Sequence, residues 1–514
     1  LVIQPNGDKR PIFFCEYAHA MGNSAGNLKE FWDQWRSLPR VIGGCIWEYK
    51  DQGLLATHSS GQPYYAYGGD FGERYFDNFT IKGIVRADGT PKQAMYECKR
   101  IFQPIQCSWD NQAKALLRID NVSQVLPVSA YNARITFSQD GTVISTHPLG
   151  KLPIGPGKSY TLPLLKYLPE QQPGAEYFID IQFELPQPTS WAPAGFVIAS
   201  NQLSWLNPKP LAPLPFNTLP FTETDTSFTC QGKNIALSIS KSTGALQSYF
   251  WQGQQQIMAP LLPNFTRPQT DNDRRGWKTH RTLKPWYEHT PQFKDVQRSG
   301  HTLQCRYSLA DDSALVLVTY SVNKQGVVKV TMEVDAANKP GLPNLPKIGM
   351  QMGLLGNYQQ WQYLGRGPYE NYIDRRYGTE VRLYTQPVQD WMEPYVVPQE
   401  TGNRTDVRWM YLQQYSQQRG WMVVADSLLS VSAWPYTQQI LEVARHTYDL
   451  KEAGGITWNI DLIQMGVGGN DSWSEVAAPL VEYQIKPGKY AYTFYLMPLD
   501  TKTIKPQQAA KRLK

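Results

Sequence analysis

The stretch Pro11-Ile-Phe-Phe-Cys-Glu-Tyr-Ala-His-Ala-Met-Gly-Asn23 organises the first part of this 514-residue chain. An apolar run at residues 12–15 ends in the acidic residue Glu16, and a Gly-Asn turn follows. A run of this length is typical of a strand that is buried on both faces, as in a parallel sheet. We therefore expect a buried strand that carries one carboxylate at its carboxyl end.

A helix and a second strand are expected next. Asn23 or Ser24 can cap the helix at its start, and Pro39 ends it. Residues 41–47 form a second apolar run. Strand, helix and strand make a βαβ unit, and carboxylates and aromatic rings at the carboxyl ends of parallel strands mark the active face of a (β/α)₈ barrel. The apolar stripe of the helix consists of Leu28, Phe31, Trp32 and Trp35.

Residues 1–104 are too few for a complete barrel. They predict two strands and two helices, the second helix from about residue 93 to 101, whereas a barrel takes about 250 residues and eight such units. We expect the C-terminal portion of a TIM barrel, with six strands supplied from elsewhere. Because the chain begins with Leu1, close to a barrel strand, we also expect an N-terminal portion that was cleaved, is a separate chain or was left out.

The remainder of the chain is rich in strand patterns. Residues 105–206, with a hairpin signal at Asp140-Gly141, predict an immunoglobulin-like β-sandwich. The proline-rich residues 207–220 predict a linker, and residues 221–514 predict a large antiparallel β-sandwich. The clearest strand patterns lie at residues 115–120, 131–139, 160–165, 177–184, 195–205, 234–240, 314–322, 327–334 and 490–497.

The composition is that of a globular protein and excludes several classes of function. Hydrophobic residues make up 41% of the chain, and no window is long enough to span a bilayer. The net charge is +6 without a basic stripe, so neither a nucleic acid nor a membrane is an expected partner. The aromatic content of 12% suits sugar binding and suits the cores of large β domains equally.

The six cysteines, at positions 15, 45, 98, 107, 230 and 305, show neither metal-ligand spacing nor a compact disulfide pattern. Cys15 and Cys45 fall in the predicted buried strands and are expected to be small core residues. Reduced thiols in a cytoplasmic protein are the default interpretation.

Glu16 is the sharpest catalytic candidate. A carboxylate at the end of a barrel strand can act as nucleophile, general acid or metal ligand. Retaining glycosidases use two carboxylates about 5–5.5 Å apart, and Glu48 or Asp70 could in principle supply the second. The structural alternative for Glu16 is an ion pair with a nearby arginine.

His19 and Trp47 are the next candidates. His19 lies three residues beyond Glu16 and could donate a hydrogen bond to a sugar hydroxyl, although a histidine near a strand end is more often structural. Trp47 ends the second strand, where an aromatic ring can be a platform for a sugar or part of the core.

Several segments together resemble the β-galactosidases of glycoside hydrolase family 2. Cys15-Glu-Tyr-Ala-His-Ala-Met-Gly-Asn-Ser24 is similar to the nucleophile motif of that family. The resemblance extends over nearly the whole chain, and the first and last motifs are specific. The other segments are Tyr67-Gly-Gly-Asp-Phe-Gly72, Phe265-Thr-Arg-Pro268 with Asp271-Asn-Asp273, Gly365-Arg-Gly-Pro-Tyr-Glu-Asn-Tyr372 and Gly466-Val-Gly-Gly-Asn-Asp-Ser-Trp473.

The resemblance implies roles for five residues. Glu16 would be the nucleophile that forms a galactosyl-enzyme, His19 would hydrogen-bond the galactose, and Trp47 would form the floor under the sugar. Trp473 would stack on the leaving group, although it could instead be a buried sandwich aromatic. Phe79 would offer its backbone carbonyl to a sodium ion.

The chain departs from the family at two points. Lys82 stands where the family has an Asn that completes the sodium shell, and its ammonium would repel Na⁺ or replace it. The acid/base Glu and the magnesium ligands of the family come from earlier barrel strands, so both cofactors, Mg²⁺ and Na⁺, are implied by the resemblance alone. Residues 271–276 resemble the mobile loop beside the site.

The expected function is that of a retaining β-galactosidase acting on terminal β-D-galactosides such as lactose. The chain would supply the nucleophile, and the N-terminal half of the enzyme would be its partner in a homo- or hetero-oligomer. Alone, the chain is expected to be inactive. The alternatives are another family 2 specificity, such as β-glucuronidase or β-mannosidase, and a non-catalytic sugar-binding or assembly subunit.

Overall fold

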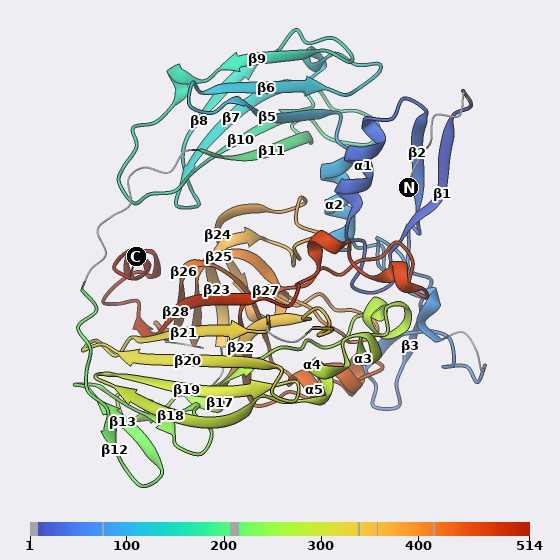
Figure 1. Ribbon diagram of the computed structural model, residues 1–514. Helices are drawn as coiled ribbons and strands as arrows, with labels where there is room; N and C mark the ends of the chain where they lie inside the picture. The colour runs from blue at the N-terminus through green and yellow to red at the C-terminus, as the bar shows by residue number, and fades with distance from the viewer. Residues whose placement is uncertain are drawn as a thin grey trace.

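Figure 1 shows the computed structural model, which describes residues 9–73, 77–205, 215–337, 340–356, 358–414 and 417–513. A short parallel sheet with two helices comes first, two small antiparallel sheets follow, and one large curled sheet makes up the rest. Most of the predicted linker at residues 207–220 lies outside the described residues.

The first region confirms the predicted βαβ unit. β1 (Ile12–His19) pairs in parallel with β2 (Val41–Trp47), and α1 (Leu28–Arg36) connects them. α2 (Gln93–Phe102) packs beside α1. The stripe on α1 faces the sheet, where the rings of Phe14 and Trp35 stack with their centroids 4.9 Å apart.

Two short strands in this region were not predicted from the sequence. β3 (Leu54–Thr57) and β4 (Pro63–Ala66) form an antiparallel ribbon, and the 3₁₀ turn η1 (Asp77–Thr80) follows it. The described part of the first region therefore holds four strands, two of them outside the parallel sheet.

The predicted start of α1 is wrong. The helix begins after Asn27, which has φ +63° and makes no capping hydrogen bond through its side chain. The side chain of Asn23 is instead committed to the large region, where its Nδ2 donates to the Tyr372 hydroxyl at 2.9 Å and to the Glu400 carbonyl at 2.7 Å. Asn23 therefore joins two regions instead of capping a helix.

The prediction that Cys15 and Cys45 are core residues is also wrong, because both are exposed. One face of the β1–β2 sheet packs on the helices, and no strand among the described residues covers the other face. Phe13 and Ile42 on that face are 54% and 65% exposed. The strands are thus buried on one face only in this chain.

The second region consists of two antiparallel sheets that share one hydrophobic core. Ile119, Ile135 and Ile181 lie in that core and come from both sheets. One sheet contains β5 (Ile105–Asn111), β6 (Leu116–Asn121) and β9 (Ser159–Pro163); the other contains β7 (Asn132–Gln139), β8 (Thr142–Gly150), β10 (Tyr177–Glu184) and β11 (Val197–Trp205).

The hairpin predicted at Asp140-Gly141 is confirmed. Gln139 pairs with Thr142, so the loop has two residues, and φ is +49° at Asp140 and +77° at Gly141. Positive φ at both positions is the requirement of a type I′ turn, which Asp-Gly meets at low cost.

The third region is one continuous antiparallel sheet of 17 strands that curls on itself through additional strand pairings such as β21–β28 and β26–β28. Its strands form a single hydrogen-bonded network. Its strands are β12 (Thr222–Glu223), β13 (Ser227–Gln231), β14 (Ile235–Ser240), β15 (Leu246–Trp251), β16 (Gln254–Gln255), β17 (Ile257–Asn264), β18 (Gln292–Ser299), β19 (Thr302–Leu309), β20 (Ala314–Val322), β21 (Val328–Asp335), β22 (Lys347–Leu355), β23 (Tyr358–Gly367), β24 (Glu380–Pro387), β25 (Arg404–Gln414), β26 (Arg419–Trp434), β27 (Gly455–Gln464) and β28 (Lys489–Asp500). Its helices are α3 (Thr279–Thr282), α4 (Lys284–Glu288), α5 (Gln438–Val443) and α6 (Pro506–Lys511).

The core of the large sheet accounts for much of the aromatic content. Six of the 16 tryptophans in the sequence, all of them in this region, are less than 2% exposed. For these residues the core interpretation holds, and they are Trp286, Trp361, Trp391, Trp421, Trp434 and Trp458.

None of the helices in the described part of the chain is long and apolar enough to cross a membrane.

Candidate active site

Glu16 lies at an irregularity within β1, and the strand continues three residues beyond it. The register between β1 and β2 shifts between Phe14 and Ala18, and Glu16 has φ +67°. A non-glycine residue in this region costs about 1–3 kcal/mol, and such strain concentrates at functional sites. Bulges of this kind redirect one side chain, and here the side chain of Glu16 is exposed.

His19 and Trp47 end their strands side by side. The parallel register pairs them, and Ala20 donates its backbone N–H to the Trp47 carbonyl at 2.8 Å. Trp47 is 41% exposed, whereas His19 is only 3% exposed. The side chain of Trp47 is therefore partly accessible to solvent, whereas the side chain of His19 is enclosed by other residues.

A glycine-rich loop of the large region, residues 466–473, packs on the segment that follows β1. The backbone N–H of His19 donates to the Gly469 carbonyl at 2.7 Å. Gly469 has φ +124°, and a Cβ at this position would lie 2.8 Å from the backbone nitrogen of Ala25. Only glycine allows this conformation and this approach.

A chain of hydrogen bonds sets the tautomer of His19. Asn272 donates through Nδ2 to the Val467 carbonyl at 3.0 Å and accepts at Oδ1 from the Ser472 hydroxyl at 2.7 Å. Ser472 has then used its only proton, so its oxygen accepts from His19 Nδ1–H at 2.8 Å. Neutral His19 therefore keeps a lone pair on Nε2 and can accept a hydrogen bond there.

Burial, reinforced by the positive charge of Lys82, lowers the pKa of His19 from 6.5 to about 4. The histidine is therefore neutral at neutral pH. Because the unfolded chain takes up this proton near pH 6.5, the folded state loses stability as the pH falls from 6.5 towards 4.

We expect a His19→Gln variant to remove this pH dependence. Between pH 7 and pH 4.5 the wild type should lose about 2 kcal/mol more free energy of unfolding than the variant. Denaturant unfolding of both proteins across this range measures the difference. Parallel curves for wild type and variant would contradict a neutral, buried His19.

Two aromatic rings from distant segments lie near His19, and Trp47 pairs with it across the parallel strands. The Trp473 ring lies edge-on to His19 with 5.2 Å between the ring centroids, and the Phe79 ring lies at 6.4 Å. Trp473 is 55% exposed, so the alternative of a buried aromatic is wrong for this residue. The Arg275 guanidinium covers the Phe79 ring at 5.0 Å. We call His19, Trp47, Phe79 and Trp473 the ring cluster.

Lys82 brings a fixed positive charge to this cluster. Its Nζ lies 3.0 Å from Glu48 Oε1, 3.5 Å from Gln52 Oε1 and 5.9 Å from the centroid of the Trp47 ring. It also contributes to the lowered pKa of His19. The ammonium is therefore held at the edge of the ring cluster.

The two alternative second acids are already paired. Glu48 is held by Lys82, and Asp70 accepts from His446 Nε2 with both carboxylate oxygens at 3.0 Å. Neither Glu48 nor Asp70 is therefore an unpaired carboxylate that could serve as the second acid.

Sequence reasoning missed the residues that hold the segment after β1 in place. Gln399 is buried, and its Oε1 accepts from the backbone N–H groups of Asn23 at 3.0 Å and Asp271 at 3.1 Å. Asp271 in turn accepts from Gln399 Nε2 at 3.0 Å and from Asn78 Nδ2 at 2.8 Å. The resemblance singled out residues 271–276, but no periodicity or spacing indicated Gln399.

Arg375 was also missed, because no periodicity or spacing in the sequence indicates its role. Its guanidinium is 3% exposed and donates to the Ser24 carbonyl, to Asn23 Oδ1 at 2.9 Å and to Glu370 Oε1 at 2.8 Å. Tyr395 also donates to Glu370, at 2.5 Å. A buried ion pair of the large sheet thus fixes the backbone of the first region.

Among the residues that the structure describes, no group of three or more His, Cys, Asp or Glu side chains could hold a metal ion.

Comparisons with known proteins agree on the kind of protein that this chain resembles. Residues 231–496 match the family model "Beta galactosidase small chain", residues 3–107 match "Glycosyl hydrolases family 2, TIM barrel domain" and residues 117–205 match "Beta-galactosidase, domain 4". A beta-galactosidase of Priestia megaterium is 33% identical over 502 residues, covering 96% of this chain and 48% of that protein. One from Aeromonas hydrophila is 31% identical, covering 95% and 48%. The chain thus spans about half the length of the curated relatives that it matches.

Proposed function

Because the chain belongs to the β-galactosidases of glycoside hydrolase family 2, we propose that it carries the nucleophile half of a retaining β-galactosidase. The observation that carries this proposal is the strained bulge that exposes Glu16 on β1, the strand that also carries His19 of the ring cluster. Among the residues that the structure describes, Glu16 has no positively charged partner, and an exposed carboxylate on the same strand as a neutral histidine suits attack on a sugar carbon.

The reaction would proceed by two displacements. Glu16 attacks the anomeric carbon through an oxocarbenium-like transition state, and a Glu from the other half of the enzyme protonates the departing oxygen. That Glu then takes a proton from water, which attacks the same carbon, releasing the galactose and restoring the Glu16 carboxylate.

The ring cluster would bind the substrate around these steps. His19 Nε2 accepts a hydrogen bond from a sugar hydroxyl, which the fixed tautomer permits. The exposed face of Trp47 lies under the apolar face of the sugar, and Trp473 stacks on the leaving group. These roles require that His19 is neutral and that the substrate can reach the rings of Trp47 and Trp473 from solvent.

A substrate panel tests the specificity. The chain combined with an N-terminal half should release nitrophenol from the β-galactoside at least about tenfold faster than from the β-glucuronide or the β-mannoside. Preference for either of the other two sugars would point to a different specificity within the family.

Magnesium and sodium are the cofactors that the resemblance implies. The described residues offer no magnesium cluster, so magnesium would be held mainly by the other half. Sodium fits poorly here, because the ammonium of Lys82 already places a positive charge at the ring cluster, and two like charges at this range repel each other. The proposed steps therefore use no sodium ion.

Accordingly, we expect the activity to be independent of Na⁺. Replacing NaCl with choline chloride at constant ionic strength should change kcat/KM by less than about twofold, well under the tenfold that 1.4 kcal/mol represents. A Lys82→Asn variant, which removes the fixed cation, is the matched comparison. A wild-type enzyme that loses its activity without Na⁺ would overturn this expectation.

A further inference from the structure

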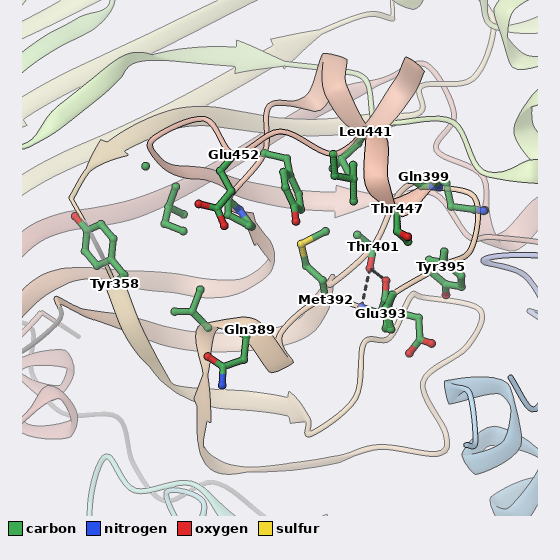
Figure 2. Close-up of a pocket in the computed structure, with 18 of the residues that line it drawn as sticks. Tyr358, Gln389, Met392, Glu393, Tyr395, Gln399, Thr401, Leu441, Thr447 and Glu452 are labelled. Atoms are coloured by element: carbon green, nitrogen blue, oxygen red, sulfur yellow. Dashed lines mark hydrogen bonds between the residues drawn. The ribbon is translucent and has the colours of Figure 1, made fainter. Parts of the chain in front are cut away.

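A cavity of about 540 Å³ lies in the large region, and none of the ring-cluster residues lines it. Figure 2 shows its lining, which comes from the start of β23, the segment before β25, and the residues on either side of α5. Ligand pockets in proteins span about 300–1,000 Å³, so there is room for one or two sugar rings.

The lining combines apolar surface with a few polar side chains. Met392, Leu441 and Ile456 provide apolar walls, and Tyr358 and Tyr436 provide aromatic rings. Pockets that bind small polar molecules are typically built in this way, with a few polar groups that fix orientation.

Several polar side chains of the lining have no partner within the protein. Among the described residues, Gln389 and Glu452 are exposed at the cavity, Tyr436 is half-buried, and none of the three makes a side-chain hydrogen bond or an ion pair. The same holds for Gln62 and Thr447, whereas other polar groups of the lining are hydrogen-bonded. Ala453 donates to the Pro435 carbonyl at 2.7 Å, which brings the segments of Tyr436 and Glu452 together. Consistent with this proximity, burial and the charge of Glu452 raise the pKa of Tyr436.

The charges of the lining restrict the ligand. No Lys, Arg or His is among the described lining residues, so the lining offers no cationic side chain to a phosphate or another anion. The carboxylate of Glu393 is occupied by Arg86 and Gln93, so Glu452 is the one carboxylate left to accept hydrogen bonds. A carboxylate, a phenol and an amide together can bind adjacent hydroxyl groups of a neutral ligand.

We propose that this cavity is a second, non-catalytic binding site for a neutral mono- or disaccharide. Glu452 and Gln389 accept and donate hydrogen bonds to its hydroxyls, and Tyr436 with Met392 contacts its apolar face. The site cannot hydrolyse a glycoside, because Glu393 is committed to its ion pair and Glu452 lacks a second free carboxylate.

The test uses the complete enzyme after its nucleophile has been blocked with a 2-fluoro-galactoside. Galactose and lactose are titrated into the blocked protein and followed by calorimetry and saturation-transfer NMR. We expect one saturable binding event that the block does not remove. Glu452→Gln and Tyr436→Ala should each weaken it at least about tenfold, while turnover by the unblocked variants should equal that of the wild type.

Glu482→Gln is the matched control, since Glu482 is an exposed carboxylate outside the cavity and its loss should leave binding unchanged. Absence of saturable binding by both sugars would overturn the proposal, and so would binding that neither cavity variant alters. Saturable binding of choline in place of the sugars would equally overturn it. The inference does not depend on the role of Glu16, because the cavity variants, and not the label, identify the site that is titrated.

Discussion

Glu16→Gln is expected to lower turnover of nitrophenyl β-galactoside at least about 10⁴-fold in the complete enzyme, because the amide cannot form the glycosyl ester. The substitution keeps the size of the side chain and, with it, the bulge at this position. Binding of a galactoside should therefore change little, so the loss appears in kcat and not in KM. Steady-state kinetics and direct titration of substrate measure the two quantities separately.

Covalent labelling gives this prediction a second, independent measurement. A 2-fluoro-galactoside should form a stable ester with the wild type, and peptide mapping should place the label on Glu16. Glu73→Gln is a suitable control, because Glu73 is exposed and, among the described residues, accepts hydrogen bonds from the backbone N–H groups of Gly69 and Phe71 in its own loop. Unchanged turnover in Glu16→Gln would leave the non-catalytic sugar-binding subunit as the better hypothesis.

Arg375→Met is expected to destabilise the chain by about 3–5 kcal/mol, because it leaves Glu370 buried without its positive partner. The same substitution removes the hydrogen bonds to Asn23 and Ser24, so the segment that follows β1 loses its anchor. We therefore expect lower activity even under conditions where the variant remains folded. Denaturant unfolding and kcat/KM at low temperature measure the two effects.

The neighbouring arginine provides the control. Arg376 is 36% exposed in its side chain and lies 3.5 Å from Asp406, so Arg376→Met should cost less than about 1 kcal/mol. Equal destabilisation by the two substitutions would show that the buried ion pair has no special role. A stable but inactive Arg375→Met variant would instead show that Arg375 acts mainly by positioning the segment that follows β1.

The elements with strong local signals were predictable from the sequence. The apolar periodicity of α1, the runs of β1 and β2 and the Asp140-Gly141 turn all follow from local steric and hydrophobic rules, and the structure confirms them. The start of α1 was predicted wrongly, because Asn23 bonds to residues about 350 positions away. No local rule contains such a partner.

The site was predictable only in part for the same physical reason. His19, Trp47 and Trp473 were named from motifs; the structure places the Trp473 ring against His19 and pairs Trp47 with His19 in the parallel register. Gln399 and Arg375, which hold the segment after β1, carry no local signal, because their role depends on tertiary contacts alone. Cys15 was expected to be buried because its apolar run is typical of a strand that is covered on both faces. The described residues include no strand that covers the second face, so Cys15 is exposed.

The hydrogen bond from His19 to Ser472 spans 453 residues, and this has a consequence for biosynthesis. At about 5–20 residues per second, the ribosome needs roughly 20–90 s to reach the serine after it has made the histidine. Throughout that interval the nascent polypeptide contains Glu16 and His19 but lacks the Ser472 hydroxyl that fixes the tautomer of His19. A polypeptide that stops before Ser472 therefore contains His19 but lacks the hydroxyl group that fixes its tautomer.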